Sequence, residues 1–474
     1  MSNGLCSFIS NVLLLACAIG LGGCVNWSGD VARYKKILNG PVPASQPAEF
    51  VEDAPLSLGR ALRLADADNE AIALQGEDYV QALAQKMRDA GTFLPTLTVA
   101  PSYTLSHGNG TSIIDNSGTT SAGTTSGSGT NTSGAAATVS SGSHQFSVPL
   151  NASATGSLAN LSTLQAAGRT VEQEAQLLLD ERQTILLQVV QSYYTALKAE
   201  HESQVYAHSV ELKSEKVRDQ AARLKLGNVR PLDLAQSESD LAGTRASLVQ
   251  SRTGSANALS ALARLIGVPA VRGKLSDEFE PPADVSTLEI WQKRAAAQRH
   301  DLLAAGRNRE AARLSVDAAI REYYPSVSLN FEYLLYKNPG NIQSWSNVLS
   351  ANIPIFSALT IEADVRKAWS VYRQAVLSES QMRRQVTDDV NENYENLTGS
   401  REQIADLQIE VEAAQRAYNL SERSYQLGSV SNLDRLTQQD NLLTAQLNLV
   451  SEQFNQKSYY LALQRAAGEL SSAQ

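Results

Sequence analysis

The sequence LGNVRPLD at residues 226–233 returns as LGSVSNLD at residues 427–434, with each matched residue 201 positions later. In both stretches the glycine follows a long helical pattern, and glycine readily takes the left-handed conformation just past a helix end. A new helix can begin at once, because Pro231 suits a first helical position, and Ser431 with Asp434 has the spacing of a capping box. Each stretch therefore predicts a tight turn between two helices.

The same offset persists further along the chain. Three residues of the first half recur in the second in one ungapped register, Leu262, Arg264 and Gly267 matching Leu463, Arg465 and Gly468. Chance similarity would drift out of register over this distance. The chain is therefore an internal duplication, and each half reads as helix, two strands, long helix, turn and helix.

The strands are predicted from apolar residues that alternate with small polar ones. They fall at about 93–106 and 144–156 in the first half, and about 326–336 and 344–356 in the second. Length and pattern suit membrane barrel strands, although a half-buried strand of a soluble sheet fits the alternation equally well. Four strands are too few to close a membrane barrel, since the smallest single-chain barrels have about eight. If these strands enter a membrane, several chains must share one barrel.

Helical heptads fill most of the remaining chain. Apolar residues seven apart predict long helices at about 158–226 and 358–427, each followed by a shorter one at 231–267 and 432–470. At 1.5 Å per residue the longer helices would reach roughly 100 Å. The fold class is therefore mainly α, with strands that are membrane β if several chains share one barrel. The expected order is a signal peptide at 1–23, a lipid-anchored tether at 24–55, repeat 1 at 56–267, a linker at 268–290, repeat 2 at 291–470 and a tail at 471–474.

The N-terminus carries an apolar run at 12–21, too short to span a bilayer as a helix, so it reads as the core of a signal peptide. The following Leu21-Gly22-Gly23-Cys24 resembles the lipobox of bacterial lipoproteins, in which the cysteine is acylated. An ordinary cleavable signal with a chance cysteine is the alternative. Val25 rather than Asp follows Cys24, which by resemblance to sorting rules favours the outer membrane. The prolines at 41, 43 and 47 predict an extended tether.

Composition excludes several other classes of function. The net charge is −9, with 40 Lys and Arg against 49 Asp and Glu, so no nucleic-acid partner is expected. All three cysteines lie in the first 24 residues, and the five histidines form no metal-binding or catalytic motif. We expect no enzyme activity, no metal and no cofactor. Residues 106–143 are 29 of 38 Gly, Ser, Thr or Asn, which predicts a flexible loop of unassigned role.

The two turns are the candidate sites. Asp233 and Asp434 each fall in the first turn of a helix, where the helix dipole favours a carboxylate without any further role. If three chains assemble, each Asp also forms a ring of three charges that attracts cations and repels anions. Tyr425, three residues before its turn glycine, would add a constriction, whereas Leu224 takes that place in the first half.

Duplicated halves, paired strands before long helices, and these two turns together resemble the TolC-like outer-membrane efflux proteins. With the Leu21–Cys24 motif, the likeness is to the lipoprotein branch that serves resistance-nodulation-division pumps. The resemblance implies a homotrimer with a twelve-stranded barrel in outer-membrane lipid, continued by a helical tunnel in the periplasm. In this resemblance Tyr425 and Asp434 match family positions at the periplasmic constriction, and Asp233 joins them as a gate candidate through the charge-ring argument above. The turn residues expected to contact the adaptor are Gly227, Val229, Leu232, Gly428, Val430 and Leu433.

The sequence departs from the family pattern at the gate. An acidic position nine residues after the turn glycine is Gln236 in the first half and Thr437 in the second, and a basic position two after the glycine is Val430. The charge ring that forms the gate is therefore left open.

The expected function is passive conduction of drugs, toxic compounds or metal ions from an inner-membrane pump, of resistance-nodulation-division or ABC type, through a periplasmic adaptor. Two alternatives remain. One is the exit channel of type I protein secretion, and the other is a lipid-anchored coiled-coil spacer without a pore.

Overall fold

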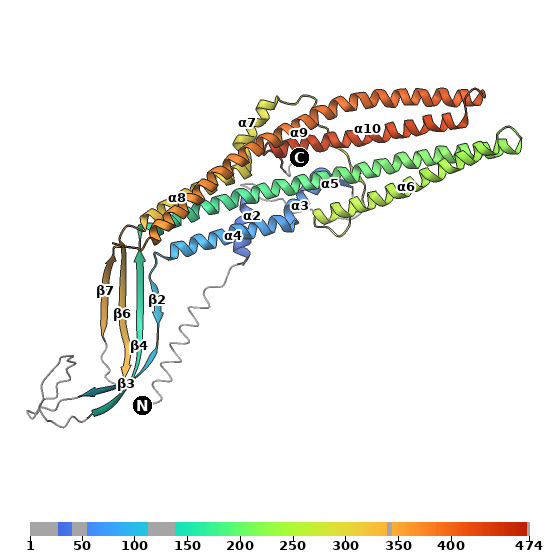
Figure 1. Ribbon diagram of the computed structural model, residues 1–474. Helices are drawn as coiled ribbons and strands as arrows, with labels where there is room; N and C mark the ends of the chain where they lie inside the picture. Colours follow the sequence, from blue (N-terminus) through green and yellow to red (C-terminus); the bar gives the residue numbers. More distant parts are fainter. Residues whose placement is uncertain (1–26, 40–54, 112–137, 339–343, 472–474) are drawn as a thin grey trace, which may run out of the picture. The chain divides into compact units, whose positions relative to one another are not determined.

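The computed structural model describes residues 27–39, 55–111, 138–338 and 344–471 (Figure 1). The elements of the first half are α2 (Trp27–Asn39), β1 (Leu56–Ser57), α3 (Leu58–Asp68), α4 (Glu70–Gly91), β2 (Thr96–Val99), β3 (Ser102–Thr111), β4 (Thr138–Gly156), α5 (Leu158–Lys225) and α6 (Pro231–Leu265). Those of the second half are β5 (Leu275–Ser276), α7 (Leu288–Gln298), α8 (His300–Arg321), β6 (Ser326–Asn338), β7 (Trp345–Asn352), α9 (Thr360–Gln426) and α10 (Asn432–Ala466).

The helices of the two repeats match in length. Helices α3 and α7 have 11 residues each, α4 and α8 have 22, and α6 and α10 have 35. The long helices α5 and α9 have 68 and 67 residues. These matching helix lengths are what a duplicated sequence predicts, whereas the strands differ, β4 having 19 residues and β7 only 8.

The chain divides into two compact units. Unit 1 comprises residues 1–84, 168–312 and 371–474, and unit 2 comprises residues 85–167 and 313–370. Unit 1 holds the helical turns, and unit 2 holds the sheet.

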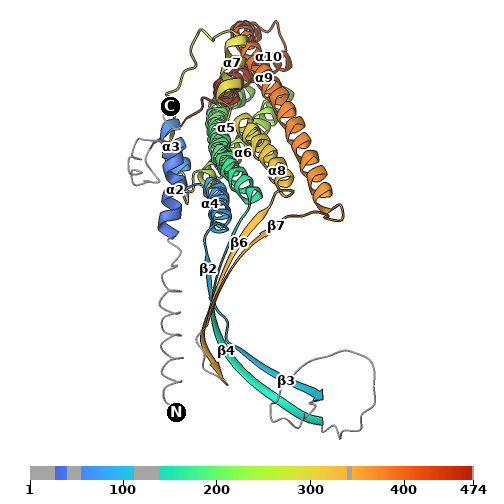
Figure 2. The same ribbon diagram turned by 90° about the vertical axis from the view of Figure 1, so that its left-hand side faces the viewer.

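Unit 2 contains an antiparallel sheet in the order β2-β4-β6-β7, with β3 paired to β4 beyond the end of β2. Figure 2 shows its strands curving along their length. Within the described chain the sheet is open, with β2 and β3 along one edge and β7 along the other. Both faces also carry exposed side chains, so one chain alone leaves this sheet uncovered.

The register sorts the side chains onto a polar and an apolar face. Ser and Thr hydroxyls lie 2.8 Å apart across the strands on the polar face, as between Thr96 and Ser153 and between Ser328 and Ser350. The apolar face carries, among others, Leu97, Val99, Leu150, Ala152, Val327, Leu329, Phe331, Tyr333 and Trp345. The pattern breaks on β7, where Asn347 lies opposite Phe331 and Val348 opposite Asn330.

The strand ends differ from the sequence prediction. The range predicted as one strand at 93–106 is divided into β2 and β3, because Pro101 lies between them and has no N–H to donate. Strands β3 and β4 continue to Thr111 and from Thr138, so both ends of the segment predicted as a loop at 106–143 are strand. Residues 112–137 lie outside the described chain. Strand β7 ends at Asn352, before Pro354, rather than at 356.

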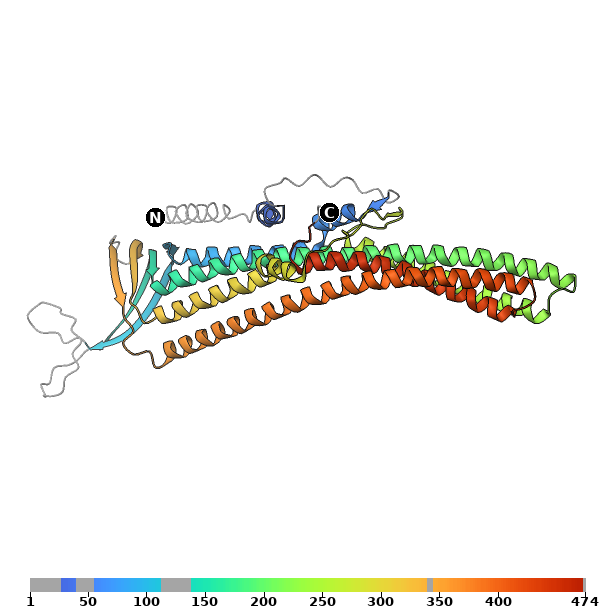
Figure 3. The same ribbon diagram turned by 90° about the horizontal axis from the view of Figure 1, so that it is seen from above.

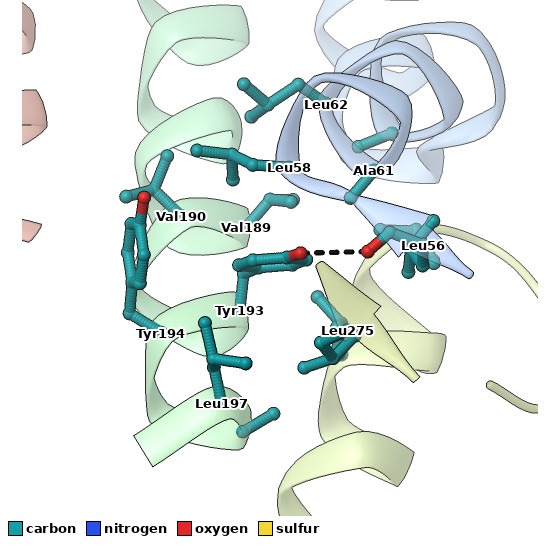
Figure 4. Packing of buried hydrophobic residues seen from close by; sticks show 14 of the residues in the cluster. Leu56, Leu58, Ala61, Leu62, Val189, Val190, Tyr193, Tyr194, Leu197 and Leu275 are labelled. Atoms are coloured by element: carbon teal, nitrogen blue, oxygen red, sulfur yellow. Dashed lines mark hydrogen bonds between the residues drawn. The ribbon is translucent and has the colours of Figure 1, made fainter. Parts of the chain in front are cut away.

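The main apolar core of unit 1 gathers around α5 (Figure 4). Tyr193 is fully buried there, and its hydroxyl lies 2.8 Å from the Leu56 carbonyl and 2.7 Å from the Ser276 carbonyl. These two carbonyls belong to β1 and β5, which pair in parallel although they come from different halves of the chain. Burial raises the pKa of the Tyr193 hydroxyl, which keeps it a neutral donor. Tyr193 therefore ties the two repeats together.

The prediction of an extended tether at 24–55 is wrong for residues 27–39, which form helix α2. Tyr34 and Leu38 are buried against Ile72 of α4 and Leu178 of α5. A Cβ at Gly76 would lie 2.8 Å from the Tyr34 ring, so glycine is what lets the ring approach. Apolar residues at helical spacing in this short segment decide the outcome, and the prolines all come after it. Residues 1–26, including Cys24, and residues 40–54 lie outside the described chain.

Candidate functional site at the helical turns

Both predicted turns are Schellman motifs. Gly227 has φ +74° and Gly428 has φ +73°, the left-handed region that glycine enters without strain. In the first turn the Gly227 N–H donates to the Leu224 carbonyl and the Asn228 N–H to the Arg223 carbonyl, at 2.9 and 3.0 Å. The second turn repeats both bonds from Gly428 and Ser429, each at 3.0 Å. Figure 3 shows the hairpins α5–α6 and α9–α10 that these turns close.

The helices that follow begin differently. Ser431 and Asp434 form the capping box: the Asp434 N–H donates to Ser431 Oγ at 3.1 Å, and the Ser431 N–H donates to Asp434 Oδ2 at 3.3 Å. Helix α6 instead starts with Pro231 at its first position, after Arg230. Arg230 reaches both carboxylate oxygens of Asp233, at 2.9 and 3.1 Å. Hydrogen bonding to Asp233 and its charge raise the pKa of Arg230.

The three residues predicted for the gate therefore have different surroundings. Asp233 is buried beside Arg230, whereas Asp434 is exposed and bonded to Ser431. Tyr425 is half-buried, with the Arg435 guanidinium carbon 4.8 Å from the centre of its ring. Its hydroxyl accepts a bond from Gln220 at 3.4 Å. The structure thus brings Tyr425 to the contact between the hairpins, while both carboxylates are bonded within their own turns.

A set of polar residues that the sequence analysis did not identify joins the two hairpins; we call Lys216, Gln220, Glu422, Asn432 and Arg435 the tip network. Gln220, Asn432 and Arg435 are buried, and Lys216 and Glu422 are half-buried. At its centre, the Asn432 side chain is only 1 % exposed. Its oxygen accepts from Gln220 of α5 at 3.1 Å and from Arg435 of α10 at 2.8 Å. Its amide nitrogen donates to the backbone carbonyl of Asp233 in α6 at 3.0 Å.

Charged groups continue the tip network outward. Arg435, 2 % exposed, lies 3.4 Å from one carboxylate oxygen of Glu422 in α9, and Lys216 of α5 lies 2.6 Å from the other. Burial by itself would raise the pKa of Glu422. The hydrogen bond and charge of Lys216, together with the charge of Arg435, outweigh burial and hold that pKa below its ordinary value. Glu422 is therefore the anion that two cations from different helices share.

A second bridge lies further along the hairpins. The Lys213 ammonium, whose side chain is 2 % exposed, donates to Asp240 of α6 at 2.8 Å and to Asp440 of α10 at 2.7 Å. It also donates to Thr244 at 2.9 Å. Burial raises the pKa of Asp240 despite the nearby lysine. One α5 lysine thus links the two shorter helices.

A weak sequence signal for the tip network exists. Asn432 and Arg435 are three residues apart and so share a face of α10, but the partner Gln220 is 212 residues away from Asn432. Heptads of apolar residues do not tell which polar side chains between them are buried. Only the pairing of the two hairpins reveals the network.

Four leucines stand out on the surface of the turns. Leu226 and Leu427, which are equivalent in the duplication, are 75 % and 84 % exposed, and the equivalent Leu232 and Leu433 are each 59 % exposed. Val229 and Val430 lie between them and are half-buried. Exposed apolar side chains gathered in one place are typical of protein-contact surfaces.

Other kinds of site are not found in the described part of the chain. No group of three or more His, Cys, Asp or Glu side chains there is placed to hold a metal ion. Among these residues, no helix combines the length and apolar character needed to cross a bilayer.

Comparisons with known proteins agree with this geometry. A family profile described as outer membrane efflux protein matches residues 114–268 and 291–469, most of both repeats. No curated protein matches the chain at a significant level.

Three solved structures share the fold. The outer membrane channel CmeC of Campylobacter jejuni has a TM-score of 0.72 and 18 % identity, over 88 % of this chain and 87 % of that one. VceC of Vibrio cholerae has a TM-score of 0.71 and 19 % identity, over 87 % and 96 % of the two chains. The open state of the MtrE outer membrane channel of Neisseria gonorrhoeae has a TM-score of 0.70 and 17 % identity, over 88 % and 90 %.

Replacing Asn432 with Ala is expected to loosen the two hairpins, because several buried polar groups lose their shared partner, at a cost of about 1–3 kcal/mol. Spin labels at the equivalent exposed positions, introduced as Asn228→Cys and Ser429→Cys, report the distance between the turns. The distance distribution should widen in Asn432→Ala. Asn441→Ala, an exposed site on the same helix, is the matched control. Equal distributions in the two variants would show that the network does not hold the hairpins.

The same label pair tests the charge of Glu422. Because its pKa in the folded protein is below the ordinary value of 4.5, its contribution is complete at neutral pH and is lost as the pH falls through that lowered pKa. The distance distribution of the unsubstituted network should widen only below about pH 4.5. In Glu422→Gln the distance distribution should already be wide at pH 7 and should change little on acidification. A Glu422→Gln distribution that is narrow at pH 7 contradicts this assignment.

Proposed function

The chain belongs to the outer membrane efflux protein family, and we propose that three copies of it form the outer-membrane channel of a tripartite efflux system. In this trimer each chain supplies four strand positions, namely β2 with β3, β4, β6 and β7, to a twelve-stranded barrel. The two open edges of the sheet support this, because an edge in hydrocarbon leaves backbone groups unpaired. The apolar face then meets lipid, and the polar face lines the pore.

The helices continue the barrel as a periplasmic tunnel that ends at the two turns. A periplasmic adaptor protein binds there through the exposed leucines of both turns, together with Gly227, Val229, Gly428 and Val430. An inner-membrane pump of resistance-nodulation-division or ABC type supplies the energy. The channel itself conducts drugs, toxic compounds or metal ions passively. The family match favours this function over a protein-secretion exit channel and over a spacer without a pore.

The closed state of the tunnel is held by the tip network. Separating the hairpins would leave the buried Arg435 without Glu422 and Asn432, so these contacts resist opening. Asp233, Tyr425 and Asp434 complete the gate around them. Adaptor binding opens the tunnel by favouring the arrangement in which these contacts are broken.

At the other end of the chain, Cys24 carries the lipid anchor. Helix α2 begins three residues after Cys24 and is docked on α4 and α5. Arg182 supports this docking, since it donates to the Leu38 carbonyl at 3.1 Å and pairs with Asp66 through two bonds of 2.6 Å. The acyl chains are therefore tied to unit 1 through a short segment.

The observation that carries the proposal is the open, two-faced sheet on a chain of this family, and two measurements test it. The detergent-solubilised protein should have three times the mass of one chain, and it should restore drug resistance to a strain lacking its own efflux channel.

The proposed adaptor contact is tested by replacing Leu226 and Leu427 with Ser. Efflux should fall by about tenfold or more, because each leucine that the adaptor buries would stabilise the interface by about 1.5–3 kcal/mol.

Leu74→Ser, at a leucine of α4 that is 70 % exposed, is the control for the turn variant. Both variants should remain trimeric, and only the turn variant should lose efflux. A stable monomer would overturn the proposed channel. Full efflux by a trimer without the turn leucines would overturn the adaptor contact.

The role of Asp434 in the gate can be separated from its role as a helix cap. Asp434→Ala removes the charge and the cap, whereas Ser431→Ala removes the cap alone, at a cost of about 1 kcal/mol. In planar bilayers, Asp434→Ala is expected to raise single-channel conductance or weaken block by cations, and Ser431→Ala should leave block unchanged. If both variants behave alike, Asp434 acts only as a capping residue.

A further inference from the structure

The polar face of the sheet in unit 2 carries one carboxylate. The strand sequences of β2, β3, β4, β6 and β7 contain Glu332 of β6 as their sole acidic residue. Glu332 is exposed, and within the described chain it makes no ion pair. It therefore presents an uncompensated negative charge on this face.

The register defines what surrounds Glu332. It lies opposite Asn151 of β4 and Ser346 of β7, and Asn151 in turn lies opposite Thr98 of β2. The row that crosses the whole sheet thus reads Thr98, Asn151, Glu332 and Ser346. The other three members are small, polar and uncharged, so none of them neutralises the carboxylate.

The nearest row with a positive charge lies far along the strands. Lys337 of β6 stands opposite Ser147, which stands opposite Ser102. Five residues of extended strand separate Lys337 from Glu332, roughly 16 Å. The Debye length at physiological salt is only about 8 Å. The charge of Lys337 therefore compensates the charge of Glu332 only weakly.

The polar face has to be the pore face of a barrel that spans lipid. Hydroxyl pairs such as Ser102 with Ser147, whose oxygens are 2.8 Å apart, are suited to water, and the opposite face carries Leu97, Leu329, Phe331 and Trp345. A charged side chain facing lipid would destabilise the barrel. Glu332 accordingly faces the aqueous lumen.

We propose that Glu332 is the residue that makes the barrel section of this channel prefer cations. This inference rests on the proposed trimer, in which the row repeats three times and sets three carboxylates at one depth of the lumen. Rings of Glu or Asp attract cations and repel anions. The effect acts at the sheet and is independent of the gate at the helical turns.

The test measures the reversal potential of trimers in planar bilayers under a KCl gradient. Glu332→Gln should lower the ratio of cation to anion permeability by about twofold or more, and Glu332→Lys should lower it further. Asn330 lies on the same face, two residues earlier on β6. Adding Asn330→Asp to Glu332→Gln should therefore restore cation preference, whereas adding Phe331→Asp, on the apolar face, should not.

The outcomes separate this inference from the proposed function. If the unsubstituted protein forms trimers and channels but Glu332→Gln leaves the reversal potential unchanged, Glu332 does not set selectivity and the channel stands. A rescue by Phe331→Asp instead of Asn330→Asp would reverse the assignment of the two faces. If the unsubstituted protein forms no channels, the proposed function itself fails.

Discussion

Backbone N–H and C=O groups cannot be left unpaired in hydrocarbon, and this constraint governs the chain's sheet. One chain offers β2 and β3 at one edge and β7 at the other, with neither edge paired in the described residues. Exposed side chains lie on both faces of the strands. A sheet built in this way is complete only when copies of the chain join edge to edge. The proposed trimer follows from this constraint, and the pore follows from the trimer.

The duplication gives the helical end two equivalent hairpins, and small sequence differences then make them unequal. Arg230 is the N-cap residue at the first turn, and because its guanidinium accepts no hydrogen bond it pairs with Asp233 instead of capping the helix. Ser431 at the equivalent place in the second half forms the capping box with Asp434. Asn432 follows it and is the residue that reaches across to α5 and α6. The two equivalent turns thus meet in an asymmetric contact. The α9–α10 hairpin supplies Asn432, and groups of the α5–α6 hairpin form hydrogen bonds with it.

Local features of the fold were predictable from sequence, and contacts between distant segments were not. The turn glycines, the capping box and the long helices depend on residues a few positions apart, and the structure has them where the pattern indicated. The docking of α2 depends on close packing of Tyr34 against Gly76 and Leu178, which no pattern within residues 24–55 reveals. The tip network likewise joins residues about 200 positions apart. Such contacts exist only once the two repeats have packed on each other.

The placement of charge along the chain separates two tasks. At the helical turns the carboxylates are bonded to neighbouring side chains: Asp233 to Arg230, Glu422 to Lys216 and Arg435, and Asp434 to Ser431. Asp233 and Glu422 pair with cations and so hold structure together, whereas Asp434 is exposed and bonded to a neutral hydroxyl, so its charge is not neutralised. On the sheet, Glu332 has uncharged neighbours across both adjoining strands. In the proposed trimer a carboxylate without a paired cation acts on passing ions, which is why we assign ion selection in the barrel section to Glu332 and closure of the tunnel to the tip network.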